Sequence, residues 1–531
     1  MSKKTFVLLI FLLLVFGVVS CASEEKVFEE AYPENDTYYE LLVRSFADSD
    51  GDGIGDFNGI TANLDYFVDL GITALWLMPI HPSPSYHGYD VMDYYDVNPD
   101  YGTMEDFDNL VSSANEKGIK IMLDMVFNHT SNEHPWFQEA LTGDETSMSY
   151  YEFIENTIDT QSKLGSWNQT IWHTTSVGKY CGYFSYTMPD LNLSNPVVFD
   201  EIVNISEFWI DKGVMGFRLD AALHFFGENE IIGETTSYLD NIIWLKDYIK
   251  AIDEYKSGIY VTAEVYEEML YQVVGDFFGA VDSPLDFPVA ALIRGASQNY
   301  TNRRYATVLE DMYDYYRRID KNFISAPFIV NHDMNRFATQ VLGDEDMLRL
   351  SAEMLLTLPG NPIIYYGEEL GMFGYKASGP DIWDETRRLP FLWNNDYQTD
   401  WVVSSNQALI ALNAQNADVD SVSDQMADPN SLWSIYEVLL RLRNENIALK
   451  YGNSFVRWDA STDSLQGFYR EITYDKYHQK LLILHNFSQD DVDMIEFNGQ
   501  IIYASNTAIE DLSGLTIIPG RSTVIIEIYG D

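Results

Sequence analysis

Arg218 and Asp220 lie in one short apolar segment and are suited to catalytic chemistry. If residues 214–220 are extended, side chains alternate between the two faces of the strand, so that Arg218 and Asp220 project on the same side. A cation beside a carboxylate favours the ionised form and lowers the carboxylate pKa, which suits a nucleophile at neutral pH. A buried structural ion pair would use the same two residues, and this segment alone does not separate the two interpretations.

Two further segments end in carboxylates. An apolar run that begins at Ile259 ends in Glu264, and we expect burial to raise the pKa of this group, as a proton donor requires. Another apolar run ends in His332 and Asp333. One strand-end carboxylate is easily structural, but three of them, with His129 at the end of a further strand, are hard to explain by packing. The pattern indicates a catalytic centre built from several strand ends.

The elements that must bring these residues together are short aliphatic segments that alternate with helical patterns. Strands that alternate with helices pair in parallel, and eight such units predict a (β/α)8 TIM barrel whose chemistry lies at the carboxyl ends of the strands. The eight predicted strands are Tyr39–Phe46, Ile72–Pro79, Ile119–Asn128, Val214–Asp220, Ile259–Glu264, Ala280–Pro284, Pro327–Asp333 and Pro362–Glu368. On this arrangement the three acids share one rim.

Two regions fall outside the barrel pattern. About eighty residues separate the third predicted strand from the fourth, far more than a helix and loops need, so we assign residues 130–195 to an inserted domain. After residue 450 the pattern alternates and becomes strand-rich, which predicts an antiparallel β-sandwich over residues 451–531. The catalytic barrel then comprises residues 37–129 and 196–450.

The N-terminus has the basic, apolar and small-residue order of a secretory signal. Two lysines precede an apolar run that ends at Val19, and Cys21 follows a serine. We assign residues 1–20 to a signal peptide, Cys21 to lipidation and residues 21–36 to a tether that holds the exported chain at the cell surface or facing the periplasm. The alternative is an ordinary signal peptide with an incidental cysteine.

The charge and the cysteines narrow the class of protein further. The formal net charge of −50 makes nucleic acid and anionic membranes poor partners, so we expect membrane contact only through the lipid. Cys181 is the one other cysteine, so a lipidated Cys21 leaves no intramolecular disulfide. With 46% apolar residues, the composition is that of a globular protein, and we expect a monomer.

An acidic loop follows the first predicted strand and has the spacing of a calcium loop. Carboxylates stand at its first, third, fifth and ninth positions, and a glycine at the sixth allows a sharp turn. It is not a complete EF-hand, because Gly59 takes the place of the closing glutamate and a strand precedes the loop. A solvated acidic turn is the alternative. The predicted ligands are the side chains of Asp48, Asp50, Asp52 and Asp56 and the carbonyl of Ile54.

These motifs resemble the conserved regions of the α-amylase family, glycoside hydrolase family thirteen, and the likeness extends from about residue 37 to the C-terminus. The four main regions are matched in order, on the expected strands, by Asp124–His129, Gly216–His224, Glu264–Tyr266 and Phe328–Asp333. The resemblance implies that Asp220 is the nucleophile, Glu264 the general acid/base and Asp333 the third acid, which helps to distort and hold the sugar.

The resemblance implies a set of sugar contacts as well. Arg388 resembles an arginine of oligoglucosidase-like members, although Arg387 is an adjacent rival. Without the resemblance, Tyr89 could simply pack in the core and His129 could be a hydrogen-bonded loop residue. The implied substrate contacts are Tyr89, Asp90, His129, Arg218, His332 and Arg388.

Substrate choice is narrowed by two features. Met188–Asn192 resembles a fifth family region in a form intermediate between oligo-1,6-glucosidase and neopullulanase types, which is also found in lipoprotein α-amylases. Leu223 stands where α-amylases commonly have lysine, which weakens the implication of strict endo-action. We expect an α-amylase acting on α-1,4-glucans and maltooligosaccharides. The alternatives are an α-glucosidase or oligo-1,6-glucosidase, a cyclomaltodextrinase or neopullulanase, and a non-catalytic glucan-binding protein.

Overall fold

The computed structural model describes most of the chain after the N-terminal segment. Cys21 and the predicted signal peptide lie outside the described residues. Asn35 and Asp36, the last residues of the predicted tether, are buried against the barrel, where Asp36 pairs with Lys120 at 2.8 Å. No described helix is long and apolar enough to cross a membrane. The described residues are 35–161, 163–165, 168–226, 238–298, 304–377, 384–394, 396–401, 414–475, 477–507 and 509–530.

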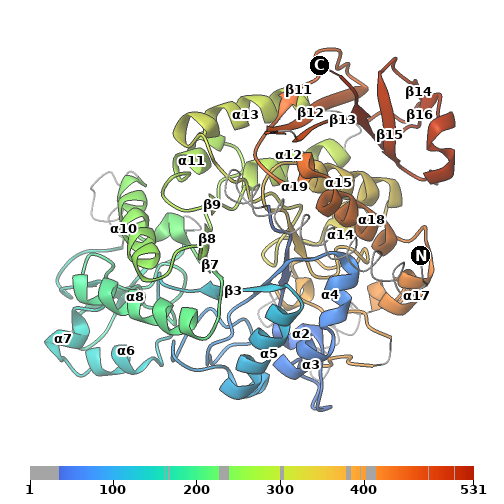
Figure 1. The fold of residues 1–531 in the computed structure, drawn as a ribbon. Coiled ribbons are helices and arrows are strands. Elements are labelled where there is room, and N and C mark those ends of the chain that lie inside the picture. Colours follow the sequence, from blue (N-terminus) through green and yellow to red (C-terminus); the bar gives the residue numbers. More distant parts are fainter. Residues whose placement is uncertain are drawn as a thin grey trace, which may run out of the picture.

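A curled, fully parallel sheet forms the centre of the molecule, with helices around its outside (Figure 1). Seven strands lie in the order β10-β1-β2-β3-β7-β8-β9. This sheet confirms the predicted TIM barrel. The strands are β1 (Tyr38–Leu41), β2 (Ala74–Leu77), β3 (Lys120–Met125), β7 (Gly216–Leu219), β8 (Tyr260–Ala263), β9 (Ser283–Pro284) and β10 (Ile363–Tyr365).

The seventh predicted strand, Pro327–Asp333, is not a regular strand. Isolated parallel bridges join Ala326, just before this segment, to Leu285, just after β9, and Phe328 to Ile363 of β10. Pro327 lacks a backbone N–H and therefore interrupts the ladder. The segment nevertheless fills the eighth place and closes the barrel.

The first predicted strand was also too long. Beyond β1 the chain forms the short helix α2 (Val43–Phe46), with Val43 and Phe46 still buried. An apolar run of this length does not distinguish a buried strand from a buried helical turn. Strand pairing ends at Leu41, and the acidic loop begins two residues after α2.

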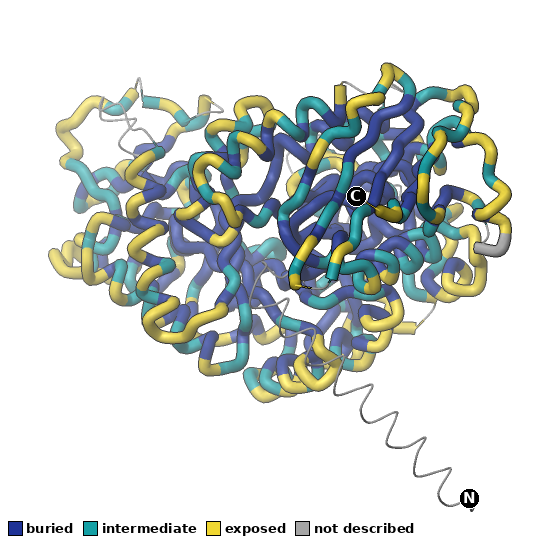
Figure 2. The backbone as a smooth tube through the Cα atoms, turned by 45° about the horizontal axis from the view of Figure 1, so that its top comes forward, coloured by how far each residue is buried: buried dark blue, intermediate teal, exposed yellow. Residues whose placement is uncertain are grey.

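Alternation along the strands separates two cores. Side chains of one parity, such as Tyr38, Ala74 and Met122, pack together inside the barrel. Their neighbours of the other parity, such as Tyr39 and Leu75, pack outward against the helices. Further along β1, β3 and β7, the inward face carries Glu40, Asp124 and Arg218, and these side chains lie at the floor of the site. Figure 2 shows the buried centre beneath an exposed outer layer.

The helical layer uses local signals that the sequence carries. Helix α5 starts with a capping box between Thr103 and Asp106, and α8 starts with Asn195 as its N-cap and proline in its first turn. The longer surrounding helices are α4 (Leu64–Leu70), α5 (Met104–Glu116), α8 (Pro196–Asp211), α10 (Leu239–Tyr255), α12 (Phe287–Gln298), α13 (Tyr305–Ile319), α15 (Glu345–Thr357) and α18 (Leu432–Glu445).

Between β3 and α8 lies a small antiparallel sheet with strand order β4-β6-β5. It is joined to the rim of the barrel by a bridge between His129 and Asp190. Its strands are β4 (Phe153–Ile154), β5 (Trp172–Thr174) and β6 (Lys179–Cys181). This sheet falls in the region assigned to the inserted domain.

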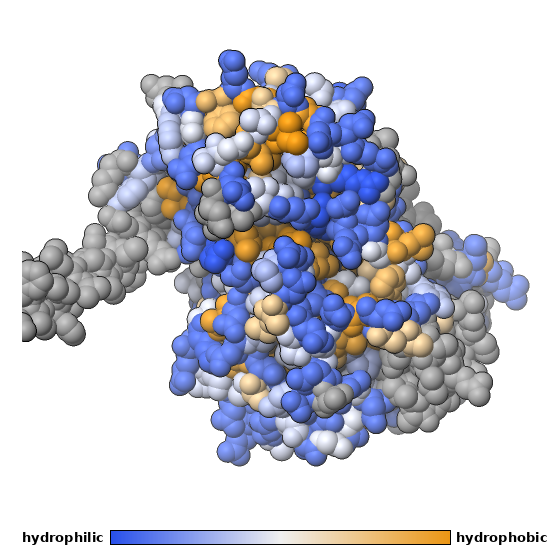
Figure 3. Space-filling model, turned by 90° about the vertical axis from the view of Figure 1, so that its right-hand side faces the viewer, coloured by the Kyte–Doolittle hydropathy of each residue, from blue (hydrophilic) through white to orange (hydrophobic). Residues whose placement is uncertain are grey.

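The C-terminal region forms two antiparallel sheets, with strand orders β11-β12-β13-β17-β15 and β14-β16. The predicted C-terminal β fold is confirmed. Buried Glu353 of α15 accepts hydrogen bonds from Tyr503 and Ser505 of this region, which fastens it to the barrel. On the face seen in Figure 3, hydrophilic side chains predominate and apolar ones gather in smaller patches, as the acidic composition predicts. The strands are β11 (Val456–Arg457), β12 (Leu465–Tyr474), β13 (Tyr477–Asn486), β14 (Val492–Asp493), β15 (Gly499–Ala504), β16 (Ile517–Ile518) and β17 (Ser522–Ile528).

Candidate active site

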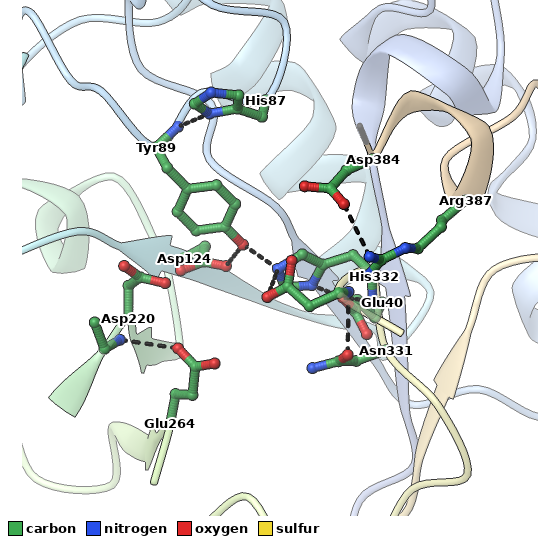
Figure 4. A network of polar contacts seen from close by, with 12 residues as sticks. Glu40, His87, Tyr89, Asp124, Asp220, Glu264, Asn331, His332, Asp384 and Arg387 are labelled. Atoms are coloured by element: carbon green, nitrogen blue, oxygen red, sulfur yellow. Dashed lines mark hydrogen bonds and ion pairs between the residues drawn. The ribbon is translucent and has the colours of Figure 1, made fainter. Parts of the chain in front are cut away.

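Arg218 is fully buried and binds three carboxylates. Its Nη1 donates to Oδ1 of Asp124 and to Oδ1 of Asp220, each at 2.7 Å, and its Nη2 donates to Oε2 of Glu264 at 2.7 Å. The parallel register places Asp124 beside Arg218 on β3 and β7, and Glu264 directly follows β8. The backbone N–H of Ala221 also donates to Glu264, at 2.9 Å. Figure 4 shows Asp220 and Glu264 side by side.

The electrostatics of this trio are set by burial and by one shared cation. Burial raises the pKa of Asp220 to about 6, against the opposing effect of Arg218. Burial likewise raises the pKa of Glu264 to about 6, as we predicted for that group. The expected lowering of the Asp220 pKa was wrong, because Asp124 and Asp333 add to the effect of burial. Carboxylates that share one cation do not all ionise together, so the site can hold a proton near neutral pH.

His332 and Asp333 form the other side of the site. His332 Nε2 lies 3.2 Å from Asp333 Oδ2 and 2.7 Å from the Tyr89 hydroxyl, and the Tyr89 ring stacks on the imidazole at 5.5 Å between centroids. His332 and Arg388 hold the pKa of Asp333 well below its usual value, although the partial desolvation of this half-exposed carboxylate acts in the opposite direction. This carboxylate is therefore ionised at any ordinary pH.

Arg388, not Arg387, contacts the third acid. Its Nη2 donates to Asp333 Oδ1 at 2.9 Å and its Nε donates to the His332 carbonyl at 3.2 Å. Arg387 instead pairs with Asp384 at 3.0 Å. The two arginines thus differ in their closest acid partner, which is Asp333 for Arg388 and Asp384 for Arg387.

The remaining predicted sugar contacts lie at different depths. His129 Nε2 lies 3.0 Å from the Tyr89 carbonyl oxygen, and both residues line the cleft. Asp90 is buried and accepts hydrogen bonds from Ser83 and Ser85.

Sequence reasoning missed Glu40 as part of this site. Its carboxylate lies 2.5 Å from His332 Nδ1, and Figure 4 shows it beneath the imidazole. Glu40 is the single acid in the apolar and aromatic run of the first strand, and a buried carboxylate in such a run was the available signal. Trp76, which donates to Asp124 at 3.3 Å, was missed as well, because a tryptophan in a buried strand reads as core.

A cleft of about 560 Å³ opens above these groups. The region between β3 and α8 lines the cleft through Phe184, Ser185 and Met188, and loops of the barrel line the rest of it. Leu223 lies in the same cleft, next to His224. The acids that reach the cleft are Asp220, Glu264, Asp333 and Asp384.

The acidic loop brings part of its predicted ligand set together. Carboxylate oxygens of Asp48, Asp50 and Asp56 lie within 4.8 Å of one another, and a hard cation such as calcium fits such a donor set. Asp52 lies outside this cluster and accepts a hydrogen bond from the backbone N–H of Ile54 at 2.7 Å. The structure thus gathers three of the four predicted carboxylates.

Comparison with known proteins agrees with the geometry. A family model of the α-amylase catalytic domain matches residues 40–452. Alpha-amylase 3 of Dictyoglomus thermophilum is 36% identical over 526 residues, which cover 97% of this chain and 98% of the relative. A 4-alpha-glucanotransferase of Thermotoga maritima is 33% identical and covers 77% of this chain and 87% of its own. The crystal structure of an α-amylase from H. orenii superimposes with a TM-score of 0.81 at 35% identity, over 94% of this chain and 100% of that chain.

Proposed function

Because this chain belongs to the α-amylase family of glycoside hydrolases, we propose that it hydrolyses the α-1,4 bonds of starch, glycogen or maltooligosaccharides with retention of configuration. The observation that carries this proposal is the pair of carboxylates, Asp220 and Glu264, held on one guanidinium at the floor of the cleft. A non-catalytic glucan-binding protein would not need that pair.

The mechanism follows from the protonation of this pair. Asp220 attacks the anomeric carbon while Glu264 protonates the leaving oxygen, which gives a glycosyl-enzyme. Water then attacks that intermediate with Glu264 as the base, and the α configuration is retained. Asp333, which is ionised between His332 and Arg388, holds hydroxyl groups of the sugar in its distorted form.

Two isosteric variants test the assignment. Asp220→Asn removes the nucleophile and Glu264→Gln removes the acid, and each is expected to lower kcat on maltooligosaccharides by roughly 10³-fold or more. The two purified proteins should keep the native circular dichroism spectrum. Near-normal turnover by either one would contradict the proposal.

Product profiles distinguish an α-amylase from the alternative activities. An endo-acting α-amylase releases mixed oligosaccharides from amylose early in the reaction, whereas an α-glucosidase or oligo-1,6-glucosidase releases glucose from chain ends. Rapid cleavage of pullulan or cyclodextrin would favour the neopullulanase or cyclomaltodextrinase alternative. Glucose as the only early product from amylose would exclude endo-action.

We further propose calcium at the acidic loop, held by Asp48, Asp50 and Asp56 with the Ile54 carbonyl and Asp52 completing the set. The three gathered carboxylates support this choice. Calcium at 100 times its Kd should stabilise the fold by about 2.7 kcal/mol, which a thermal melt with and without chelator measures. Asp50→Ala should abolish the difference. A melting temperature that does not respond to calcium would rule the site out.

We also propose that Cys21 is lipidated and that the enzyme is exported and membrane-anchored. The support is the order of residues at the N-terminus. Expression with radiolabelled palmitate should label the native chain but not Cys21→Ala. An unlabelled native chain would leave the ordinary signal peptide as the explanation.

A further inference from the structure

Glu40 is a buried carboxylate that the mechanism above does not use. Its side chain on β1 has an exposed fraction of 0%. Oε1 lies 2.5 Å from His332 Nδ1 and 3.4 Å from the backbone nitrogen of His332. Oε2 has no hydrogen-bond partner among the described residues. Within the described part of the chain, His332 is therefore the one residue that neutralises this carboxylate.

The opposite edge of the His332 ring meets two more oxygen atoms, from Tyr89 and Asp333. The Tyr89 hydroxyl donates its single proton to Asp124 at 3.0 Å, which leaves its lone pairs to accept from His332 Nε2. A neutral imidazole carries one N–H and can donate to only one edge. The doubly protonated ring donates at both edges, to Glu40 on one and to the tyrosine and aspartate on the other.

We propose that Glu40 is a positioning residue that keeps His332 doubly protonated, so that both ring N–H groups hold their partners. The inference rests on the proposed function, since it concerns the same glycosidase site. Burial alone would lower the pKa of His332, but Asp333 and Glu40 raise it to about 10. The charged and titratable groups that face His332 are Glu40 from β1, Tyr89 from the loop after β2, Asp124 from β3, and Asp333 and Arg388 from the rim.

Glu40 keeps His332 doubly protonated through its negative charge as well as through its shape. Glutamine at this place could still accept a hydrogen bond from Nδ1, but it would no longer balance the imidazolium. The remaining anions are Asp333, whose side chain is 49% exposed and thus screened by water, and Asp124, which lies beyond the Tyr89 hydroxyl. In Glu40→Gln we therefore expect His332 to lose its second proton at lower pH than in the native protein.

Imidazole ¹⁵N NMR on the histidine-labelled protein, without substrate, tests the proposal directly. In the native protein both His332 nitrogens should stay protonated from about pH 6 to about pH 9, whereas a free histidine titrates near 6.5. In Glu40→Gln the His332 ring should titrate within that interval. The variant His332→Asn identifies the signal among the nine histidines.

Glu353→Gln is the matched control. Glu353 is also fully buried, with Oε1 hydrogen-bonded and Oε2 without a partner among the described residues, but it faces the C-terminal sheets. This variant should leave the His332 titration unchanged. A native His332 that titrates near neutral pH, or a Glu40→Gln protein in which it stays doubly protonated, overturns the proposal. If Glu40→Gln does not fold, the native titration and the charge-keeping variant Glu40→Asp, in which double protonation is expected to persist, still decide.

Kinetic measurements then test whether the second proton of His332 affects hydrolysis. In Glu40→Gln the loss of kcat/KM on a maltooligosaccharide should be about tenfold greater at pH 9 than at pH 6, since each pH unit beyond a pKa changes the protonated fraction tenfold. A loss that is equal at both pH values would leave Glu40 with a structural role only. A native chain without hydrolase activity would refute the proposed function, while the NMR titration would still report on Glu40.

Discussion

Asp220 and Asp333 face the same cleft, but the number of cations beside each differs. Asp220 shares the single guanidinium of Arg218 with two other carboxylates, and its pKa rises to about 6. Asp333 lies beside two cations, Arg388 and His332, the second of which it shares with Glu40, and its pKa falls. Two aspartates in one cleft therefore differ in protonation: Asp220 can hold a proton near neutral pH, and Asp333 cannot. Burial raises the pKa of both acids, and the number of cations beside each acid decides whether that rise is offset.

We expect the largest loss of stability from replacing Arg218, because this one cation pairs with three carboxylates. Arg218→Met leaves three carboxylates around a buried apolar side chain and should lower the free energy of unfolding by about 3–5 kcal/mol. Arg388→Met leaves one half-exposed carboxylate that keeps His332, and should cost only about 2 kcal/mol. Urea unfolding at neutral pH measures both values. If both variants lost the same free energy of unfolding, the carboxylates around Arg218 would have to be largely protonated already, because protonated carboxyl groups need no cation beside them.

Part of this site could be predicted from the sequence alone. Alternation along a strand placed Arg218 and Asp220 on one face, and the parallel barrel brought Glu264 and Asp333 to the same rim. Those inferences need only local parity and the rule that strand ends converge. The pairing of Glu40 with His332 joins residues 292 positions apart and depends on how the barrel closes, which no local pattern contains.

The rise of the Asp220 pKa could not be predicted for a related reason. Its neighbour Arg218 is visible in the sequence, but Asp124 competes for the same guanidinium from another strand, and the burial of all three groups follows from barrel closure. Local charge pairing gave the wrong sign because the sum over the whole site decides it.

The second effect is a pH dependence of stability that has opposite signs for Asp220 and Asp333. The folded pKa of Asp220, about 6, exceeds its unfolded value near 4, so the folded state binds the extra proton and stability falls as pH rises through that window. Asp220→Asn removes this loss and should stabilise the protein by about 3 kcal/mol at pH 7, with little change near pH 4. Urea titrations at the two pH values measure it.

Asp333→Asn is the counterpart with the opposite sign. The folded pKa of Asp333 lies below its unfolded value, so its contribution is present above about pH 4 and is lost as pH falls. This variant should therefore destabilise the protein at pH 7 and lose that effect in acid. Destabilisation by both asparagine variants at pH 7 would remove the distinction between the two sides.

The smallest expected effect distinguishes Arg388 from Arg387, its neighbour in the sequence, near Asp333. Arg388→Lys replaces a fork that contacts Asp333, the His332 carbonyl and the Tyr86 hydroxyl with a single ammonium, which can keep the charge but not all three contacts. We expect kcat/KM on maltooligosaccharides to fall about tenfold, equivalent to about 1.4 kcal/mol. Arg387→Lys is the matched control, because Arg387 lines the same cleft but pairs with Asp384, and its loss should be within about twofold. A greater loss in Arg387→Lys than in Arg388→Lys would mean that the substrate draws Asp333 toward the other arginine, and the contact geometry would then describe only the free enzyme.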